Sequence, residues 1–263
     1  QVEEFMLNEV LPYYANSHTE ASFCGQFMTQ LRQSSRETIA QICGADSRHA
    51  VVFTGAGATA GLNRLVHLLG VNKPTKQAPL VIIGPYEHHS NILPWRESGA
   101  QVIQLQEAVK GGPDLVQLEE LLQTNSTRLI VGAFSAASNV TGIKADVCKI
   151  TQLLKLYGAA SVWDYAGGAP YMNIDMAAGT DFEIDAVVMS PHKFIGGPGA
   201  SGVMIVRKAA ITATTPTNPG GGTVSFVSPW EHYYSESIVA REEAGTPNVV
   251  GDIRAALCFI VKA

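Results

Sequence analysis

The sequence predicts an α/β fold: a mostly parallel, seven-stranded sheet with helices on both of its faces. Two observations predict it. Short apolar runs alternate with longer segments of helical periodicity, and the short runs contain few polar residues. Near-continuous apolar strands are typical of sheets that are covered on both faces. A chain of 263 residues, 46% hydrophobic and 16% charged, is long enough to bury a sizeable core.

The elements can be placed one by one. Residues 26–43 have a loose helical face that includes Leu31 and Ile39, and Gly44 is a plausible end for this helix. Further helices are expected from the glycine-rich segment 54–61 through Leu69, after His89, and over residues 114–122 and 145–157. The predicted strands are the apolar runs 50–53, 79–83, 101–105, 127–134, 159–164, 185–189 and 202–206. The segment NPGGGT at 218–223 is predicted to be a flexible loop.

Polar and glycine-rich clusters follow five of the predicted strands, each just past the strand's end. They are residues 54–61, 87–91, 135–141, 164–168 and 190–193. In sheets of this kind, ligands bind beyond the carboxyl ends of the strands. The sequence therefore predicts one site at this rim of the sheet.

Two charged residues stand at strand ends where a solvated charge is not expected. Lys193, in SPHKFIGGPGASGV, can form a Schiff base with an aldehyde cofactor if its surroundings lower its pKa. A surface lysine in a turn is the alternative. Asp164 ends the run AASVWD, and a buried carboxylate requires a partner. A protonated pyridine nitrogen would be a suitable partner, and a helix N-cap is the alternative.

The segment GAGATAG at 55–61 opens a helix directly after a strand. Small residues let backbone N–H groups approach an anion, and the helix N-terminus adds partial positive charge, so a phosphate cradle is expected here. Thr59 offers its hydroxyl to the same group. The segment also satisfies the dinucleotide fingerprint G-x-G-x-x-G/A. That fingerprint expects an acidic residue at the end of the second strand, and LVIIGP at 80–85 ends without one.

Other polar side chains fall at the same rim. His88 and His89 are adjacent, so we expect them to point in different directions and not to share a metal ion; one can lie flat on an aromatic ring. Ser190 and His192, beside the lysine, offer hydroxyl and imidazole donors to a phosphate. Asn139, in SAASNVTG, can bond a ring hydroxyl. Ordinary structural roles are the alternative for each of these residues.

Composition argues against several classes of protein. A net charge of −5 and the lack of a basic run predict no nucleic-acid partner. No stretch approaches the roughly 18 uncharged apolar residues of a membrane helix, so no membrane contact is expected. The four cysteines form no CxxC pair, which argues against a zinc site and against a secreted disulfide scaffold. A reducing, cytoplasmic location is therefore expected. The chain does not begin with Met, and we expect both ends to be truncated, so organellar targeting stays open.

Taken together, the motifs resemble those of fold-type I pyridoxal 5′-phosphate (PLP) enzymes, in particular the aminotransferase class V and cysteine desulfurase branch. The resemblance runs from about residue 20 to the end of the chain. Seven motifs stand in family order: TGAGATAGLN, YEHHSNILPW, SAASNVTG, VWDYAGGAP, SPHKFIGGPGASGV, NPGGGT and REEAGTPNVVG. The resemblance implies an N-terminal segment at 1–25, a PLP-binding large domain at 26–263, and a C-terminal small domain that is absent from this chain.

The resemblance also implies which residues contact PLP. The expected contacts are Lys193 as the Schiff-base amine, Asp164 at the pyridine nitrogen, His88 on the ring, Asn139 near the ring hydroxyl, and Ala58, Thr59, Ser190 and His192 around the phosphate or the lysine. Thr223, in NPGGGT, resembles the loop residue that reaches the phosphate in the other subunit. A homodimer with shared sites is therefore implied.

The implied activity is that of a transferase or lyase whose substrate is a small molecule, an amino acid. Two departures from the family pattern matter. Gly167 stands where cysteine desulfurases carry Gln, three residues after the aspartate, and none of the four cysteines matches the family's nucleophile. Two alternatives stay open: an NAD(P)-binding Rossmann oxidoreductase, which rests on GAGATA, and a catalytically inactive module with the same fold.

Overall fold

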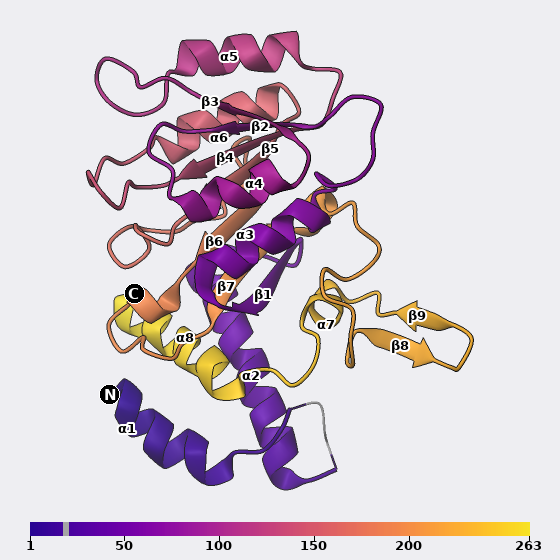
Figure 1. Ribbon diagram of the computed structural model, residues 1–263. Coiled ribbons are helices and arrows are strands. Elements are labelled where there is room, and N and C mark those ends of the chain that lie inside the picture. The colour runs from indigo at the N-terminus through magenta and orange to yellow at the C-terminus, as the bar shows by residue number, and fades with distance from the viewer. Residues whose placement is uncertain (18–20) are drawn as a thin grey trace.

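The computed structural model describes residues 1–17 and 21–263 (Figure 1). Seven strands form the main sheet: β1 (His49–Gly55), β2 (Leu80–Ile83), β3 (Gln101–Gln104), β4 (Ile130–Ser135), β5 (Ala160–Asp164), β6 (Ala186–Met189) and β7 (Gly202–Arg207). Their spatial order is β1-β7-β6-β5-β4-β2-β3. Strand β7 runs antiparallel to both of its neighbours, and the other pairs in this sheet are parallel. The predicted seven-stranded, mostly parallel sheet is confirmed.

Helices cover both faces of the sheet, as predicted. One apolar cluster joins one face to α2 (Phe23–Ile42), α5 (Leu115–Thr124), α6 (Val147–Leu156) and α8 (Val249–Lys262). A second cluster joins the opposite face to α3 (Gly57–Leu68) and α4 (Leu93–Glu97). Strand β1 shows the division, since Val51 and Phe53 belong to the first cluster while Ala50 and Val52 belong to the second.

Capping side chains account for the differences between predicted and observed helix starts. Ser22 accepts a hydrogen bond from the Gly25 N–H, so α2 begins three residues before the predicted position 26. Asp114 accepts from the Val116 and Gln117 N–H groups, which places it before α5 and not inside it. Asp146 caps α6 in the same way. Side-chain caps therefore set these boundaries more sharply than apolar periodicity does.

Two short segments depart from the predicted helices. The helix expected after His89 is a 3-10 turn at His89–Asn91 followed by the five-residue α4. At the N-terminus, α1 (Val2–Phe5) continues into a π-helical turn at Met6–Val10 and a 3-10 turn at Leu11–Tyr13. An apolar cluster packs Val2 and Met6 against α2 and α8. Among the described helices, none is long and apolar enough to cross a membrane.

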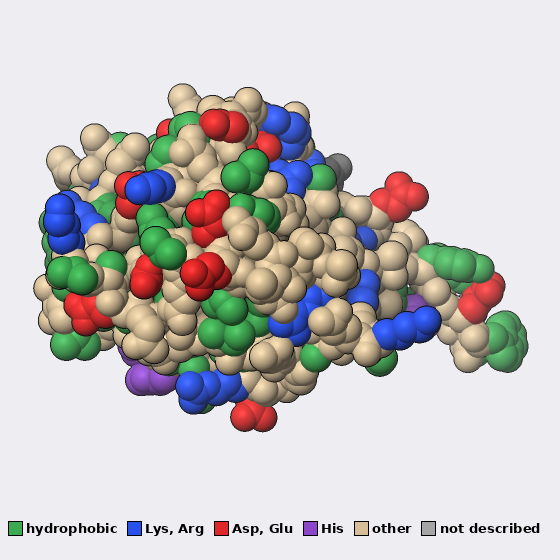
Figure 2. Space-filling view, turned by 90° about the horizontal axis from the view of Figure 1, so that it is seen from above, with side chains coloured by type: hydrophobic (Ala, Val, Ile, Leu, Met, Phe, Trp, Pro, Cys, Tyr) green, Lys and Arg blue, Asp and Glu red, His purple; other side chains and the backbone are tan. Residues whose placement is uncertain are grey.

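A two-stranded hairpin, β8 (Val224–Val227) and β9 (His232–Tyr234), follows the NPGGGT loop and projects from the body (Figure 1). The sequence did not predict it, because its strands are short and most of their side chains are exposed. The exposed side chains include Phe226, Trp230 and Tyr233. Figure 2 shows apolar side chains on the projecting part, and acidic and basic groups interspersed over the rest of that face. After the hairpin comes the short helix α7 (Ile238–Glu242).

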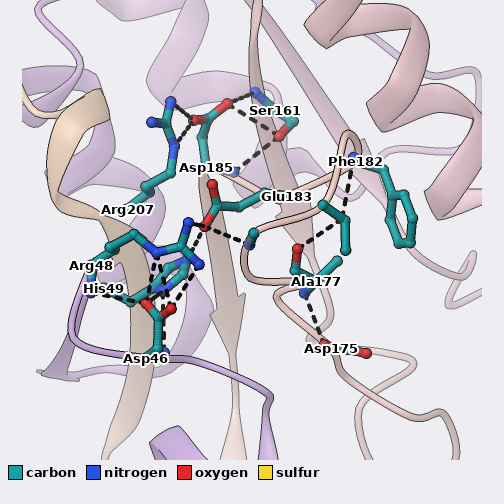
Figure 3. A network of polar contacts seen from close by, with 12 residues as sticks. Asp46, Arg48, His49, Ser161, Asp175, Ala177, Phe182, Glu183, Asp185 and Arg207 are labelled. Atoms are coloured by element: carbon teal, nitrogen blue, oxygen red, sulfur yellow. Dashed lines mark hydrogen bonds and ion pairs between the residues drawn. The ribbon is translucent and has the colours of Figure 1, made fainter.

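A polar network lies at the amino-terminal ends of β5 and β6 (Figure 3). Asp185 is 1% exposed, and it accepts hydrogen bonds from the Ser161 N–H at 2.9 Å, from Arg207 Nε at 2.7 Å and from Lys155 Nζ at 2.7 Å. Arg207 ends β7 and Ser161 lies in β5, so one carboxylate ties three strands and α6 together. The charges at this end of the strands are satisfied by one another.

Candidate active site

A cavity of about 150 Å³ lies at the opposite end of the strands from this network, beyond the carboxyl ends of the parallel strands. Residues from all five polar clusters that follow the strands line it. The lining residues are Ala56, Ala58, Thr59, His88, Ser90, Ser135, Ala137, Asn139, Asp164, Ala166, Gly167, Ser190, His192 and Lys193. The structure thus brings eight of the nine predicted site residues to a single cavity.

Thr223 is the ninth predicted residue, and it lies outside this cavity. Its side chain is buried, and its hydroxyl donates to the Gly220 carbonyl at 2.6 Å within its own loop. The sequence prediction concerned a contact with a second subunit. A contact across a dimer therefore stays a prediction.

The glycine-rich loop leads into α3 with no side-chain cap, so the first N–H groups of the helix lack intrahelical partners. One of them, the Ala58 N–H, donates to Ser190 Oγ at 3.0 Å. Gly57 has φ +64°, and a Cβ there would lie 2.7 Å from His192 Cε1 and 2.9 Å from Ser190 Oγ. Only glycine therefore allows the loop to pack against Ser190 and His192.

Asp164 ends β5 and is 4% exposed. Its Oδ1 accepts from the Ala166 N–H at 2.7 Å, and no helix follows, so the N-cap alternative is wrong. No described residue donates to Oδ2. Burial raises the pKa of this carboxyl, while the Ala166 hydrogen bond and the charge of Lys193 act in the opposite direction. The site therefore contains a desolvated carboxyl with one oxygen free for a ligand.

Lys193 ends the 3-10 turn Pro191–Lys193 that follows β6. Its backbone N–H donates to the Ser190 carbonyl at 2.9 Å, which fixes the start of its side chain. No described carboxylate forms an ion pair with its ammonium group. Lys193 is exposed and lies in a turn, as the surface-lysine alternative expects, and it also lines the cavity. Lys193 is therefore an unpaired amine at the cavity that contains Asp164.

The rings of His88 and His89 lie against each other, with centroids 3.9 Å apart and planes 32° apart. The expectation that they point in different directions is wrong, because the backbone changes from extended at His88 to a 3-10 turn at His89. His88 Nδ1 accepts from the Ser90 N–H at 3.1 Å, which leaves Nε2 to hold the proton. Burial, His89 and Lys193 all lower the pKa of His88, which favours the neutral ring.

Desolvation also acts on the side of the cavity next to the N-terminus of α3. It lowers the pKa of His192, and the charge of Lys193 lowers it further. The Thr59 hydroxyl donates a hydrogen bond to Ser90 Oγ at 2.9 Å, which links α3 to the histidine turn, the 3-10 turn at His89–Asn91. Asn139 is exposed at the cavity wall and makes no hydrogen bond with a described residue.

Sequence reasoning missed two residues of the site, Ser135 and Glu87. Ser135 ends β4 and lines the cavity, and both its N–H and its hydroxyl donate to the carboxylate of Glu87. Both positions follow strand ends, and that was the available signal. The sequence could not show that two such side chains face one another. Among the described residues, no three His, Cys, Asp or Glu side chains are arranged to bind a metal ion.

Comparisons with known proteins identify the family of the chain. The family model described as "Aminotransferase class-V" matches residues 1–260. A "Probable cysteine desulfurase" of Halalkalibacterium halodurans is 30% identical over 245 residues, which is 92% of this chain and 58% of that protein. "Cysteine desulfurase CsdA" of Escherichia coli is 30% identical over 243 residues, covering 90% of this chain and 58% of that protein.

Solved structures show the same fold. The apo structure of a cysteine desulfurase from Thermococcus onnurineus has a TM-score of 0.83 and 26% identity, covering 99% of this chain and 63% of that one. The E. coli cysteine desulfurase CsdA has a TM-score of 0.78 and 27% identity, covering 94% of this chain and 60% of that one. The chain thus spans about three fifths of the length of the proteins it matches.

Proposed function

Because the chain belongs to the aminotransferase class-V family, we propose that it binds PLP and acts on an amino acid as a transferase or lyase. The observation that carries this proposal is the presence of both Lys193 and Asp164 at one cavity. The first is a cation without an ion pair, and the second is a buried carboxyl with a free oxygen. Each lacks a partner that a pyridoxal ring would supply.

The residues around the cavity fit the chemical groups of PLP. The N-terminus of α3 offers backbone N–H groups to a phosphate, with Ser190 and His192 packed against it. Asp164 Oδ2 is free to accept from a protonated pyridine nitrogen. The neutral ring of His88 provides a flat surface at the cavity wall. When bound, PLP would supply an aldehyde carbon and a ring that withdraws electrons from the substrate.

The protein's own groups would divide the remaining work. The amine of Lys193 would hold the cofactor as a Schiff base, and the free amine would serve as general base for the proton on the substrate's α-carbon. Asp164 would keep the pyridine nitrogen protonated, because an ionised carboxylate stabilises the adjacent cation. The cradle at α3 would fix the phosphate and so orient the ring relative to both residues.

The Rossmann alternative is not favoured. In a dinucleotide site, an acidic residue after the second strand binds the ribose hydroxyls. Here the acidic residue that follows β2 is Glu87, whose carboxylate is already occupied by hydrogen bonds from Ser135 and Asn91. An acceptor used in this way is not available to a ribose.

The amino-acid substrate is the open part of the proposal. The curated relatives are named as cysteine desulfurases, so L-cysteine is the first substrate to test. Gly167 lines the cavity without a side chain at the position where the desulfurase pattern has Gln, so amino transfer should be assayed in parallel. A homodimer that is cytoplasmic and contacts neither nucleic acid nor membrane completes the proposal.

The experiment is to add PLP to the protein and to Lys193→Ala, with Lys110→Ala as the control. Lys110 is exposed, and its replacement removes the same charge outside the cavity. We expect a visible absorbance band in the wild type and in the control, and its loss in Lys193→Ala. Borohydride reduction followed by peptide mass spectrometry should place the cofactor on residue 193. A wild-type protein that takes up no PLP, or a label on another lysine, would refute the assignment.

A further inference from the structure

Glu87 stands at the rim of the site, and the proposed chemistry does not use it. Its Oε1 accepts from the Ser135 N–H at 2.9 Å, and its Oε2 accepts from the Ser135 hydroxyl at 2.6 Å and from Asn91 Nδ2 at 2.7 Å. A Cβ at Gly84 would lie 2.6 Å from Oε1, so a glycine makes room for the carboxyl group. These contacts hold the carboxyl group in one place.

Two of the three groups around this carboxyl can only donate. The Ser135 N–H is a backbone donor. Asn91 Oδ1 accepts from the Trp95 indole N–H at 3.0 Å, so Asn91 must turn its amino group toward Glu87. Asn91 and Trp95 are both 0% exposed, so water cannot replace either contact. The Ser135 hydroxyl is the one member of the three that can either donate or accept.

Ser135 also connects Glu87 to the cavity. It lines the cavity, and it pairs in register with Asp164 on the neighbouring strand β5. When Glu87 is ionised, the Ser135 hydroxyl donates to it and leaves oxygen lone pairs for the cavity. When Glu87 is protonated, its proton has only Ser135 Oγ to bond, because the other two neighbours are donors. The hydroxyl proton of Ser135 is then free to be donated into the cavity.

Both states of Glu87 are accessible near neutral pH. Desolvation raises the pKa of Glu87 to about 7, against the lowering effect of its hydrogen bonds from Ser135 and Asn91. Asp164, on β5, is the charged group that raises it further. The other neighbours, Ser135 on β4 and Asn91 on the histidine turn, are uncharged, and His88 is adjacent in sequence.

We propose that Glu87 is a positioning residue that determines, through Ser135, whether the cavity beside Asp164 meets a hydrogen-bond donor or an acceptor. The proposal rests on the proposed function for the identity of the ligand. The reversal of the hydrogen bond between Ser135 and Glu87 does not require a ligand and is expected in the protein alone. This separation allows the two to be tested independently.

The first test uses the protein free of PLP. Infrared spectra recorded across pH 5–9 should show a carboxylic-acid C=O band that disappears with a midpoint near pH 7. Glu87→Gln should lack this band, and Glu107→Gln, an exposed glutamate that bonds Tyr86, should keep it. Ser135→Ala removes the acceptor for the acid proton, so the band should move to higher frequency. If the wild type and Glu87→Gln give the same spectra at every pH, the inference is overturned.

The second test is a double-mutant cycle on the PLP-loaded protein. Glu87→Gln should shift the midpoint of the pH-dependent visible absorbance by about one pH unit, because the amide fixes the Ser135 hydroxyl in one direction. In a Ser135→Ala background, the same replacement should produce no further shift, and Glu107→Gln should produce none in either background. An equal shift with and without the Ser135 hydroxyl would show a purely structural effect and refute the proposal. A wild type that takes up no PLP would refute the proposed function but leave the infrared result standing.

Discussion

At the scale of single residues, the cavity differs from the rest of the structure in how its charges are paired. Asp185, at the opposite end of the strands, accepts from Ser161 and Arg207 (Figure 3). It also accepts from Lys155. Asp164, at the cavity, accepts from one backbone N–H, and Lys193 has no ion pair with a described residue. Lys193 is exposed, but Asp164 is buried, and desolvating a carboxylate without a full set of partners is costly, so Asp164 indicates a site for a ligand.

The pKa of Glu87 predicts how stability depends on pH. Folding raises this pKa from its usual 4.5 to about 7, so between these values the folded state holds a proton that the unfolded state has released. The stability that Glu87 contributes is therefore complete below about pH 4.5 and is lost as pH rises through 7. From pH 5 to pH 8, the wild type should lose on the order of 2 kcal/mol more unfolding free energy than Glu87→Gln.

Urea unfolding at several pH values provides the measurement. Glu107→Gln is the control, because it removes an exposed carboxylate outside the cavity. Its curve should keep the pH dependence of the wild type. Parallel curves for the wild type and Glu87→Gln would contradict the raised pKa.

Substitutions at two nearby glycines, Gly55 and Gly57, can distinguish the effect of backbone strain from the effect of a steric contact with the site. Gly55 and Gly57 both have positive φ, +76° and +64°, but a Cβ at Gly55 meets nothing within 4 Å while one at Gly57 meets Ser190 and His192. Alanine at either position should cost on the order of 1 kcal/mol of unfolding free energy through strain alone. Gly57→Ala should in addition weaken PLP binding roughly tenfold, because it displaces groups of the phosphate cradle.

Thermal unfolding and PLP titration of the two variants test this. The comparison is informative because the strain is shared and the steric contact is not. If both variants bind PLP with equal affinity, then the packing of the loop on Ser190 does not serve the cofactor.

At the scale of elements, a buried ion network holds the helices of one face to the sheet. Glu243, directly after α7, accepts from Arg36 Nη1 at 2.9 Å and from the Phe53 N–H of β1 at 2.8 Å, and it also pairs with Arg32. Arg32, on α2, pairs in turn with Asp252 of α8 at 2.6 Å. Burial alone would raise the pKa of Glu243, but Arg36 and Arg32 lower it overall.

Removing one partner of this network should destabilise the fold strongly, because the others stay buried and unpaired. We expect Glu243→Gln to cost about 3–5 kcal/mol of unfolding free energy. Glu236→Gln, at an exposed position, should change it by less than about 0.5 kcal/mol. Because the pKa of Glu243 is lowered, its contribution should fade as the pH drops, and chemical unfolding at neutral and acidic pH would show this. A loss below about 1 kcal/mol would mean that water or a rearranged partner replaces the carboxylate.

Elements with strong local patterns could be predicted from the sequence. Most of the seven strands of the main sheet are apolar runs, and the number and approximate bounds of the strands are confirmed. The hairpin β8–β9 was missed, because its short strands carry exposed residues such as Phe226 and Tyr233 and contribute nothing to the core. Helix ends were displaced wherever a cap such as Ser22 set the start.

The site was predictable to the extent that strand ends are predictable. Parallel strands bring their carboxyl ends together, so Asp164 and Lys193 could be assigned to one rim without coordinates. Direct contacts between side chains were not predictable. Ser135 and Glu87 are 48 residues apart, and the sequence gives no sign that they bond. The stacking of His88 on His89 depends on a local change of backbone conformation that the pattern could not show.

At the scale of the whole molecule, the two ends of the strands differ in how their polar groups are paired. At one end, the carboxylate of Asp185 connects three strands and α6, which favours a fixed arrangement. At the other, five loops contribute side chains to the cavity, and several of their polar groups have no partner. The network that favours stability and the proposed ligand site thus lie at separate ends of the same strands.

The reversed direction of β7 has a mechanical consequence. Because β7 runs against β6, the chain that leaves the cavity at Lys193 returns to the same edge at Gly202, where a Cβ would lie 2.5 Å from the backbone of Gly57. One short stretch thus carries the Lys193 amine at one end and packs against the glycine-rich turn at Gly57 at the other. A displacement of the Lys193 amine would be transmitted to that turn through the backbone contact between Gly202 and Gly57. The contacts at the two ends of a bound ligand would therefore form or break together.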